Sequence, residues 1–107
     1  MSWEMEYKPE AKKELDGLNK SVQPIIIAGI RKVAMNPLPQ HEGGYGKPLG
    51  HYHGLNLTGL FKIKFKKPGI RVIYQLKRER KRMVIIIVGI RADEEVYRIA
   101  AQRKENL

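Results

Sequence analysis

Lysine, arginine and tyrosine side chains recur in the second half of the chain at positions from which they could act together on a phosphate group. Lys62, Lys64 and Arg71 alternate with apolar residues in two extended segments. Arg91 directly follows a run of valines and isoleucines, and Tyr97 comes six residues later in a predicted helix, off its apolar stripe. Packing does not explain the last two positions. If these side chains converge, they form a cationic site with one phenol.

Such a site suits cleavage of RNA by its own 2′-hydroxyl group. The reaction needs help in removing the 2′ proton, stabilising the charge on the pentavalent phosphorane and protonating the departing 5′ oxygen. Clustered cations stabilise the charge directly, and a lysine or tyrosine whose pKa is lowered by positive neighbours can act as a base. A histidine pair is not required, because in-line phosphoryl chemistry depends on positioning and electrostatics.

Each residue also has a purely structural interpretation. A lone lysine on the polar face of a strand is usually solvated, and an arginine after a strand commonly pairs with a nearby carboxylate. Tyr97 as a half-buried tyrosine that covers a sheet edge is as good a hypothesis as a catalytic Tyr97. Only convergence of the side chains favours function.

Residues 60–76 position three of these side chains, and their alternation of apolar and polar residues predicts a β-hairpin. Pro68 and Gly69 suit the two central positions of a tight turn. The predicted cross-strand pairs are Lys67 with Ile70, Lys66 with Arg71, Phe65 with Val72 and Ile63 with Tyr74. One face should join a core, whereas the other, with Lys62, Lys64, Lys66, Arg71, Ile73 and Gln75, should remain open to an anionic partner, foremost a phosphate backbone.

The remaining pattern predicts the order strand, helix, helix, strand, strand, strand, helix in an α+β fold. A helical hairpin should pack on a mainly antiparallel twisted sheet, with the last helix beside the sheet. The expected elements are a strand over residues 3–7, a helix from Pro9 to within 17–20, a helix capped by Ser21 and stopped at Asn36–Pro37, a largely irregular connection over 37–59, the hairpin, a strand over 83–90 that is buried on both faces, and a helix from Asp93 with Val96, Ile99, Ala100 and Arg103 inward.

Length and charge bound the function. A chain of 107 residues supports one domain, which we place at residues 1–107. The net charge is +10, and residues 58–107 carry fourteen Lys/Arg against five Asp/Glu. This asymmetry favours nucleic acid, an anionic membrane surface or an acidic protein as partner. Without cysteine, a membrane-spanning run or a signal peptide, the chain is expected to be soluble and cytoplasmic.

The sequence gives no reason to expect a metal or a small-molecule cofactor. His41, His51 and His53 are scattered and have no nearby pair of carboxylates, so they would make weak metal ligands. Asp93, Glu94 and Glu95 could suggest magnesium, but acidic residues at the start of a helix are explained more simply by the helix dipole.

Five short motifs together resemble RelE-type toxins of the RelE/ParE superfamily. They are Gly-Lys-Pro-Leu-Gly at 46–50, Gly-Leu-Phe-Lys-Ile-Lys at 59–64, Gly-Ile-Arg-Val-Ile-Tyr-Gln at 69–75, Val-Gly-Ile-Arg at 88–91 and Glu-Val-Tyr at 95–97. The resemblance implies a metal-independent endonuclease that cuts mRNA in the ribosomal A site and is held inactive by an antitoxin. Residues 37–59 depart from it, because this segment is longer than in compact RelE toxins and contains the three histidines.

The resemblance also assigns roles to the five side chains. It implies that Lys64 is the base, with Tyr97 the other candidate or a stacking platform, that Arg71 stabilises the phosphorane and Lys62 adds positive charge, and that Arg91 is the leading candidate for the acid. Lys66, Lys67 and Arg82 are expected to add contacts to RNA. The implied partners are an acidic antitoxin and the ribosome, through both ribosomal RNA and A-site mRNA.

Two other functions fit the same fold and charge. A ParE-like toxin would inhibit gyrase, and a degenerate toxin would only bind nucleic acid or its antitoxin. The complete set of five residues favours the endonuclease.

Overall fold

A five-stranded sheet organises the chain in the computed structural model, which describes residues 3–52, 54–90 and 93–105. The strands are β1 (Glu4–Tyr7), β2 (Lys47–Tyr52), β3 (Leu55–Phe65), β4 (Ile70–Lys77) and β5 (Arg82–Gly89), in the spatial order β1-β5-β4-β3-β2. β1 pairs parallel with β5, and the other neighbours are antiparallel. The sheet is therefore mainly antiparallel, as the sequence predicted.

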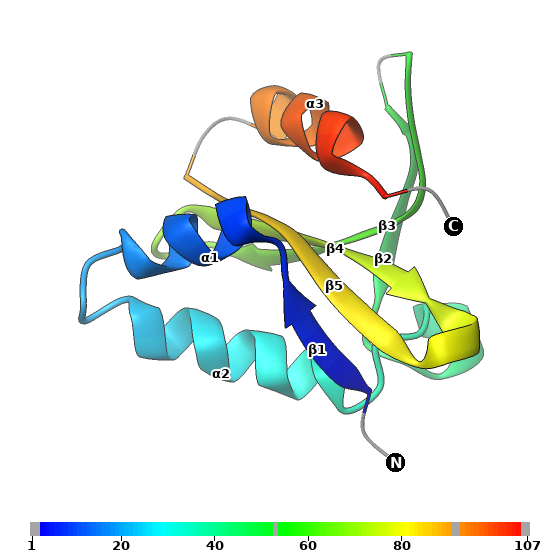
Figure 1. Ribbon diagram of the computed structural model, residues 1–107, viewed down its shortest axis with the longest axis horizontal. Coiled ribbons are helices and arrows are strands. Elements are labelled where there is room, and N and C mark those ends of the chain that lie inside the picture. Colours follow the sequence, from blue (N-terminus) through cyan, green and yellow to red (C-terminus); the bar gives the residue numbers. More distant parts are fainter. Residues whose placement is uncertain (1–2, 53, 91–92, 106–107) are drawn as a thin grey trace.

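Three helices cover both faces of this sheet (Figure 1). α1 (Pro9–Asp16) and α2 (Gln23–Ala34) lie on one face, and α3 (Asp93–Arg103) lies on the other. Two short 3-10 helices, η1 (Gln40–Glu42) and η2 (Arg78–Arg80), belong to connections. The α+β class is confirmed, and the element order is the predicted one with a strand added. None of the helices in the described part of the chain is both long and apolar enough to cross a bilayer.

The first core lies between the sheet and the helical hairpin. Its buried residues include Ala11 and Leu15 of α1, Ile26 and Ile30 of α2, and the alternate β4 residues Ile70, Val72, Tyr74 and Leu76. Apolar side chains thus occupy one stripe of each helix and every second strand position, as amphipathic elements require. The Tyr74 hydroxyl donates a hydrogen bond to the Pro37 carbonyl oxygen at 2.9 Å, and burial raises its pKa.

A second core corrects the prediction that the lysine face of the hairpin lies open. Ile73 and Gln75 are fully buried on this face, which α3 covers. The cluster consists of Leu57, Leu60, Ile73, Val84, Ile86, Ile87, Val96, Tyr97 and Ala100. The basic side chains therefore share their face with a hydrophobic core and lie at its margin.

The hairpin register differs from the prediction by two residues. Phe65 pairs with Ile70, Lys64 with Arg71, Ile63 with Val72 and Phe61 with Tyr74, so none of the four predicted pairs forms. A two-residue hairpin turn needs a positive φ at its first central position, which proline cannot adopt. The chain instead uses a four-residue connection, 66–69, closed by Gly69 at φ 68° with its N–H on the Lys66 carbonyl at 3.2 Å. Because the shift is even, both faces keep their predicted residues.

Residues 37–59 are more regular than the sequence predicted. They contain η1, β2 and the first part of β3, and the β2–β3 hairpin rises past α3 as an arm (Figure 1). Three prolines and six glycines hide this pattern. Gly59, at φ 86°, lies next to a shift in the β2–β3 register, where an irregular backbone requires its freedom.

The predicted N-cap of the second helix is also wrong. α2 begins at Gln23, one residue after Val22, and has no side-chain cap. Both the backbone N–H and the hydroxyl of Ser21 instead donate to Asn19 Oδ1, at 3.0 and 2.9 Å. Ser21 therefore stabilises the turn before α2 and does not cap the first N–H groups of the helix.

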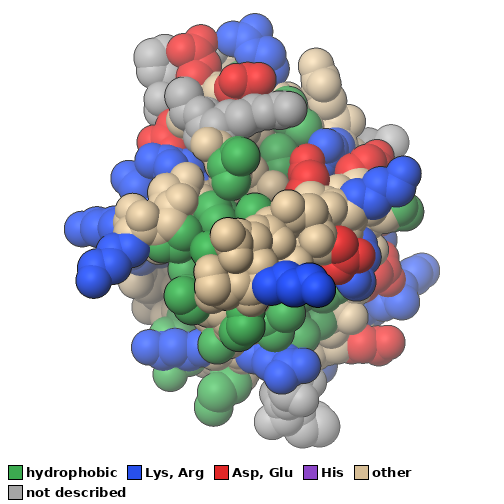
Figure 2. All heavy atoms as spheres, turned by 90° about the vertical axis from the view of Figure 1, so that its left-hand side faces the viewer, with side chains coloured by type: hydrophobic (Ala, Val, Ile, Leu, Met, Phe, Trp, Pro, Cys, Tyr) green, Lys and Arg blue, Asp and Glu red, His purple; other side chains and the backbone are tan. Residues whose placement is uncertain are grey.

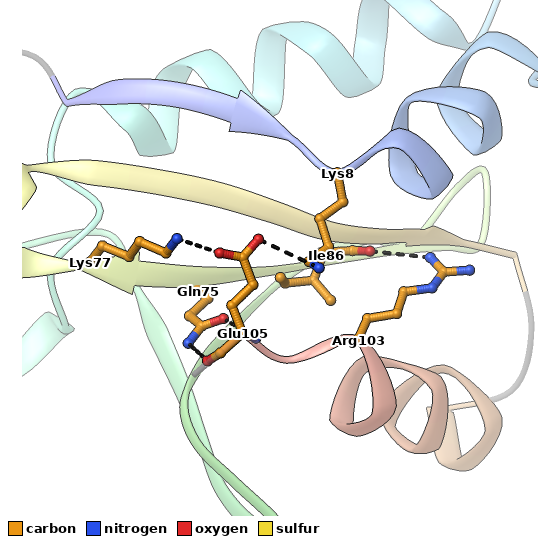
Figure 3. A network of polar contacts seen from close by, with 6 residues as sticks. All are labelled: Lys8, Gln75, Lys77, Ile86, Arg103 and Glu105. Atoms are coloured by element: carbon orange, nitrogen blue, oxygen red, sulfur yellow. Dashed lines mark hydrogen bonds and ion pairs between the residues drawn. The ribbon is translucent and has the colours of Figure 1, made fainter. Parts of the chain in front are cut away.

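The C-terminal end of α3 is clasped to the sheet (Figure 3). The buried Gln75 amide donates to the Glu105 carbonyl at 2.8 Å and accepts from the Glu105 N–H at 2.9 Å. The Glu105 carboxylate bonds to Lys77 and forms an ion pair with Lys8 at 3.4 Å. Arg103 donates to the Ile86 carbonyl at 3.1 Å and to both carboxylate oxygens of Glu14. These contacts fix α3 over the second core.

Candidate nucleic-acid interface

Cross-strand pairing gathers four basic side chains into a row, which we call the basic row. Lys47 of β2 lies opposite Lys62 of β3, and Lys64 of β3 lies opposite Arg71 of β4. Directly paired residues project to the same face of a sheet, and alternate residues on one strand do so too. All four side chains therefore lie on the α3 face. Like charges set side by side repel, so the row favours an anion that neutralises it.

Arg71 is a partly enclosed member of the basic row. Its side chain is 20% exposed and forms an ion pair through Nε with Oδ1 of Asp93, in the first turn of α3. Its Nη1 lies 3.4 Å from the Gly69 carbonyl oxygen, at the edge of hydrogen-bonding range. Lys64, across the strand, is exposed. The start of α3 thus sets where the guanidinium lies, whereas the lysine amine beside it reaches solvent.

The predicted acid, Arg91, lies outside the described residues. Gly89 pairs with Arg71 in the sheet and precedes Arg91 by two positions. A Cβ atom placed on Gly89 would come within 2.8 Å of Val96 Cγ2. Glycine is therefore required here, because α3 approaches the end of β5 closely.

Tyr97 lies in the second core, which corrects the prediction that it sits off the apolar stripe of its helix. The side chain is 4% exposed and clusters with Val96 and Ala100. Leu57, from the β2–β3 arm, belongs to the same cluster and widens the apolar arc that α3 buries. The packing hypothesis for the Tyr97 ring thus has a direct structural basis.

The three residues expected to extend RNA binding fall in two places. Lys66 and Lys67 are exposed in the β3–β4 turn, next to Lys64 and Arg71. Arg82 starts β5 at the other end of the sheet and forms an ion pair with Glu6 at 2.9 Å. Figure 2 shows the face of the molecule that carries the β3–β4 turn, with lysine and arginine side chains along its margins and hydrophobic side chains between them.

The two histidines that the structure describes, His41 and His51, do not join the basic row. His41 is exposed in η1, where Nε2 lies 3.7 Å from the Glu42 carboxylate, and the exposed His51 lies on β2 opposite Asn56. His53 lies outside the described residues. Within 3–52, 54–90 and 93–105, no three histidine, cysteine, aspartate or glutamate side chains gather as a metal-binding group would.

Sequence reasoning missed two members of this region. Lys47 was not assigned because its strand was not predicted, although it stands in the Gly-Lys-Pro-Leu-Gly motif. Asp93 was interpreted only as a helix-start residue, although the sequence places it two residues after Arg91. Its pairing with Arg71 depends on how α3 folds back on the sheet, which no local pattern encodes.

Comparisons with known proteins agree with this architecture. A family model described as the ParE toxin of the type II toxin–antitoxin system parDE matches residues 5–97. A RelE-like toxin protein of Escherichia coli is 26% identical over 106 residues, which cover 96% of this chain and 98% of that protein.

Solved structures of E. coli RelE share the fold. A double mutant in the free state superposes with a TM-score of 0.73 at 24% identity, covering 96% of this chain and 98% of that one. The same mutant in complex with an antitoxin peptide gives a TM-score of 0.68 at 23% identity, covering 94% and 95%.

Proposed function

Because the chain belongs to the ParE toxin family of type II toxin–antitoxin systems, within the RelE/ParE superfamily, we propose that it is a ribosome-dependent endoribonuclease that cleaves mRNA in the ribosomal A site. The observation that carries this proposal is the direct pairing of Lys64 with Arg71. This pair supplies an accessible amine and an oriented guanidinium on one face of the sheet, with Lys62 on the same strand.

In the proposed reaction, the 2′-oxygen attacks the adjacent phosphorus, a 2′-O–P bond forms and the P–O5′ bond breaks. Lys64 takes the 2′ proton, and Arg91 gives a proton to the departing 5′ oxygen. Arg71 and Lys62 neutralise the charge that develops on the phosphorane. The products are a 2′,3′-cyclic phosphate and a 5′-hydroxyl. In this scheme side chains provide both proton transfers.

Tyr97 takes a supporting part in this proposal. Its ring belongs to the second core and lies four residues after Asp93, which pairs with Arg71 at the start of α3. We assign Tyr97 to positioning the start of α3. The Lys64 amine then remains the candidate base.

The partner we propose is an acidic antitoxin segment that covers the basic row. Such a segment would exclude RNA and neutralise the local field in one step. The fold shared with RelE bound to an antitoxin peptide supports this proposal. Acting on ribosome-bound mRNA also places ribosomal RNA next to Lys66 and Lys67.

A second candidate function is inhibition of gyrase. The description of the matching family as ParE toxins favours it. The two functions differ in what they require of the basic row, because the phosphoryl chemistry depends on Lys64 and Arg71, whereas gyrase inhibition has no need for them as a pair.

A reconstituted translation reaction separates the candidates. Four proteins are tested: the purified chain, Arg71→Ala, Arg91→Ala and the control Lys13→Ala. Each is added to the reaction with and without ribosomes, and mRNA 5′ ends are mapped by primer extension. Lys13 is exposed on α1, on the opposite face of the sheet. We expect ribosome-dependent cuts with the chain and with Lys13→Ala, and a loss of about a hundredfold or more in both site variants. Inhibition of gyrase supercoiling without any mRNA cut would overturn the proposal.

A further inference from the structure

A pocket lies at the C-terminal end of β4, where Phe61 and Leu76 belong to the α1–α2 face of the sheet, whereas the basic row lies on the α3 face. Its volume is about 640 Å³, within the range of small-molecule sites. Gly59, Phe61 and Leu76 line it together with residues 77–80. We call it the turn pocket. Lys77 lies six positions after Arg71 on β4, roughly 20 Å away, whereas Phe61 directly precedes Lys62 and its side chain projects to the other face of the sheet. In Figure 1 the β3–β4 turn and η2 lie at opposite ends of the sheet.

The lining of the turn pocket is apolar and preformed. Phe61 and Leu76 are each 5% exposed, and the Phe61 ring stacks on Tyr74 with centroids 5.1 Å apart and planes inclined by 10°. Among the described residues, apart from Gly59 and its two chain neighbours, no atom lies within 4 Å of the position that a Cβ on Gly59 would take. The missing side chain therefore leaves open space beside an anchored aromatic ring, where a flat ligand could lie.

The rim of the turn pocket is cationic. The lining residues 77–80 hold three basic side chains and one acidic one. Lys77 is engaged by Glu105, and Arg78 donates to Glu42 Oε1 at 3.0 Å. Arg80 and the adjacent Lys81 are exposed, and neither has an ion-pair partner among the described residues. Two cations thus remain available for an anion at the edge of an apolar hollow.

We propose that the turn pocket binds one nucleotide of single-stranded RNA. The base enters the hollow beside Gly59, at the edge of Phe61 and Leu76, and Arg80 and Lys81 hold the phosphate. An apolar surface beside cations is the combination by which proteins bind single strands without reading sequence. The inference rests on the proposed function, because it supplies a second contact for RNA held at the basic row.

Adenosine monophosphate is the probe that tests the turn pocket. Backbone amide signals are followed by NMR while the chain is titrated with adenosine monophosphate, with adenosine, with inorganic phosphate and with an oligoglutamate peptide. We expect the nucleotide to shift the signals of Gly59, Phe61 and Leu76 more strongly than either of its parts does. Arg80→Ala should weaken this binding about fivefold, the loss expected for one phosphate contact, and also weaken binding of decauridylate.

Lys20→Ala is the matched control, since Lys20 is exposed in the α1–α2 connection and its loss removes the same charge. Three results would overturn the inference: unmoved signals at these amides, an equal response to phosphate alone, or a response to oligoglutamate without one to the nucleotide. Arg71→Ala separates this inference from the proposed function, because it should abolish mRNA cleavage and leave nucleotide binding at the turn pocket unchanged. Nucleotide binding without any mRNA cleavage would refute the endonuclease and retain the pocket.

Discussion

At the scale of one residue, two roles are open to Tyr97: its hydroxyl could take part in catalysis, or its ring could serve only in packing. Its 4% exposure in the second core favours the ring. We expect Tyr97→Phe to retain mRNA cleavage within about threefold, whereas Tyr97→Ala should lower the free energy of unfolding by about 3–5 kcal/mol. Cleavage assays and urea denaturation measure the two effects. A loss in Tyr97→Phe as large as in Arg71→Ala would restore the catalytic role.

Asp93 places a carboxylate beside the basic row and competes with phosphate for Arg71. We expect Asp93→Asn to bind decauridylate about two- to fivefold more tightly at low salt, because one opposing charge is removed. Fluorescence anisotropy at two salt concentrations measures this change. Glu94→Gln is the matched control, since Glu94 lies in the same helical turn but pairs with Arg98 at 3.1 Å. Weaker binding by Asp93→Asn would mean that the position in which Asp93 holds Arg71 contributes more to RNA affinity than removal of the negative charge does.

The clasp at the end of α3 makes stability depend on pH at the scale of an element. The Lys77 ammonium, together with Lys8, holds the pKa of the Glu105 carboxyl below its ordinary value of 4.5. A depressed folded-state pKa stabilises the fold above the unfolded-state pKa, and this contribution is lost as pH falls through the folded value. Glu105→Gln should therefore melt below the parent chain at pH 7, and the gap should narrow as pH falls below 4.5, the ordinary pKa of a glutamate.

Melting curves from pH 3 to pH 7 follow this gap. Glu10→Gln serves as the control, because Glu10 is an exposed glutamate in the first turn of α1 that forms no ion pair among the described residues. A gap of constant size across the range would mean that the carboxylate does not stabilise α3 through its charge.

The elements show which parts of the fold the sequence can predict. Alternation sorted residues 60–76 onto the right faces, because a shift of two residues keeps the parity of a strand. The register itself was not predicted correctly, because it depends on the turn. Pro68 cannot adopt the positive φ that a two-residue turn needs, whereas Gly69 adopts a positive φ at the end of the four-residue connection. The strand β2 was not predicted because Pro48 and Gly50 interrupt its sequence pattern. Without β2 and its arm, nothing indicated that the arc buried on α3 would reach Tyr97.

The candidate site divides in the same way. Lys62, Lys64 and Arg71 were predicted from strand alternation and a family resemblance, and the structure places them on one face. Lys47 and the carboxylate partner of Arg71 come from elements distant in sequence, so only the folded sheet and α3 bring them in.

Charge acts at the scale of the whole molecule. With a net charge of +10, association with RNA should weaken steeply as salt rises. Removal of Lys62 or Lys64 should reduce the slope of the logarithm of affinity against the logarithm of salt concentration by about 0.7 each, the value for one contact to a single strand. Ribosome pelleting across salt concentrations measures the slope, with Lys13→Ala as control. An unchanged slope would mean that these lysines contact no phosphate.

The chemistry of the cut ends tests the endonuclease most directly. Ribosomes translating a defined mRNA are treated with the purified chain, and both fragments are recovered and analysed by mass spectrometry. We predict a 2′,3′-cyclic phosphate on the upstream fragment and a 5′-hydroxyl on the downstream fragment, both absent with Lys64→Ala. A 3′-hydroxyl on the upstream fragment with a 5′-phosphate on the downstream fragment would contradict the account. Intact mRNA from a chain that still arrests growth in cells would contradict it too.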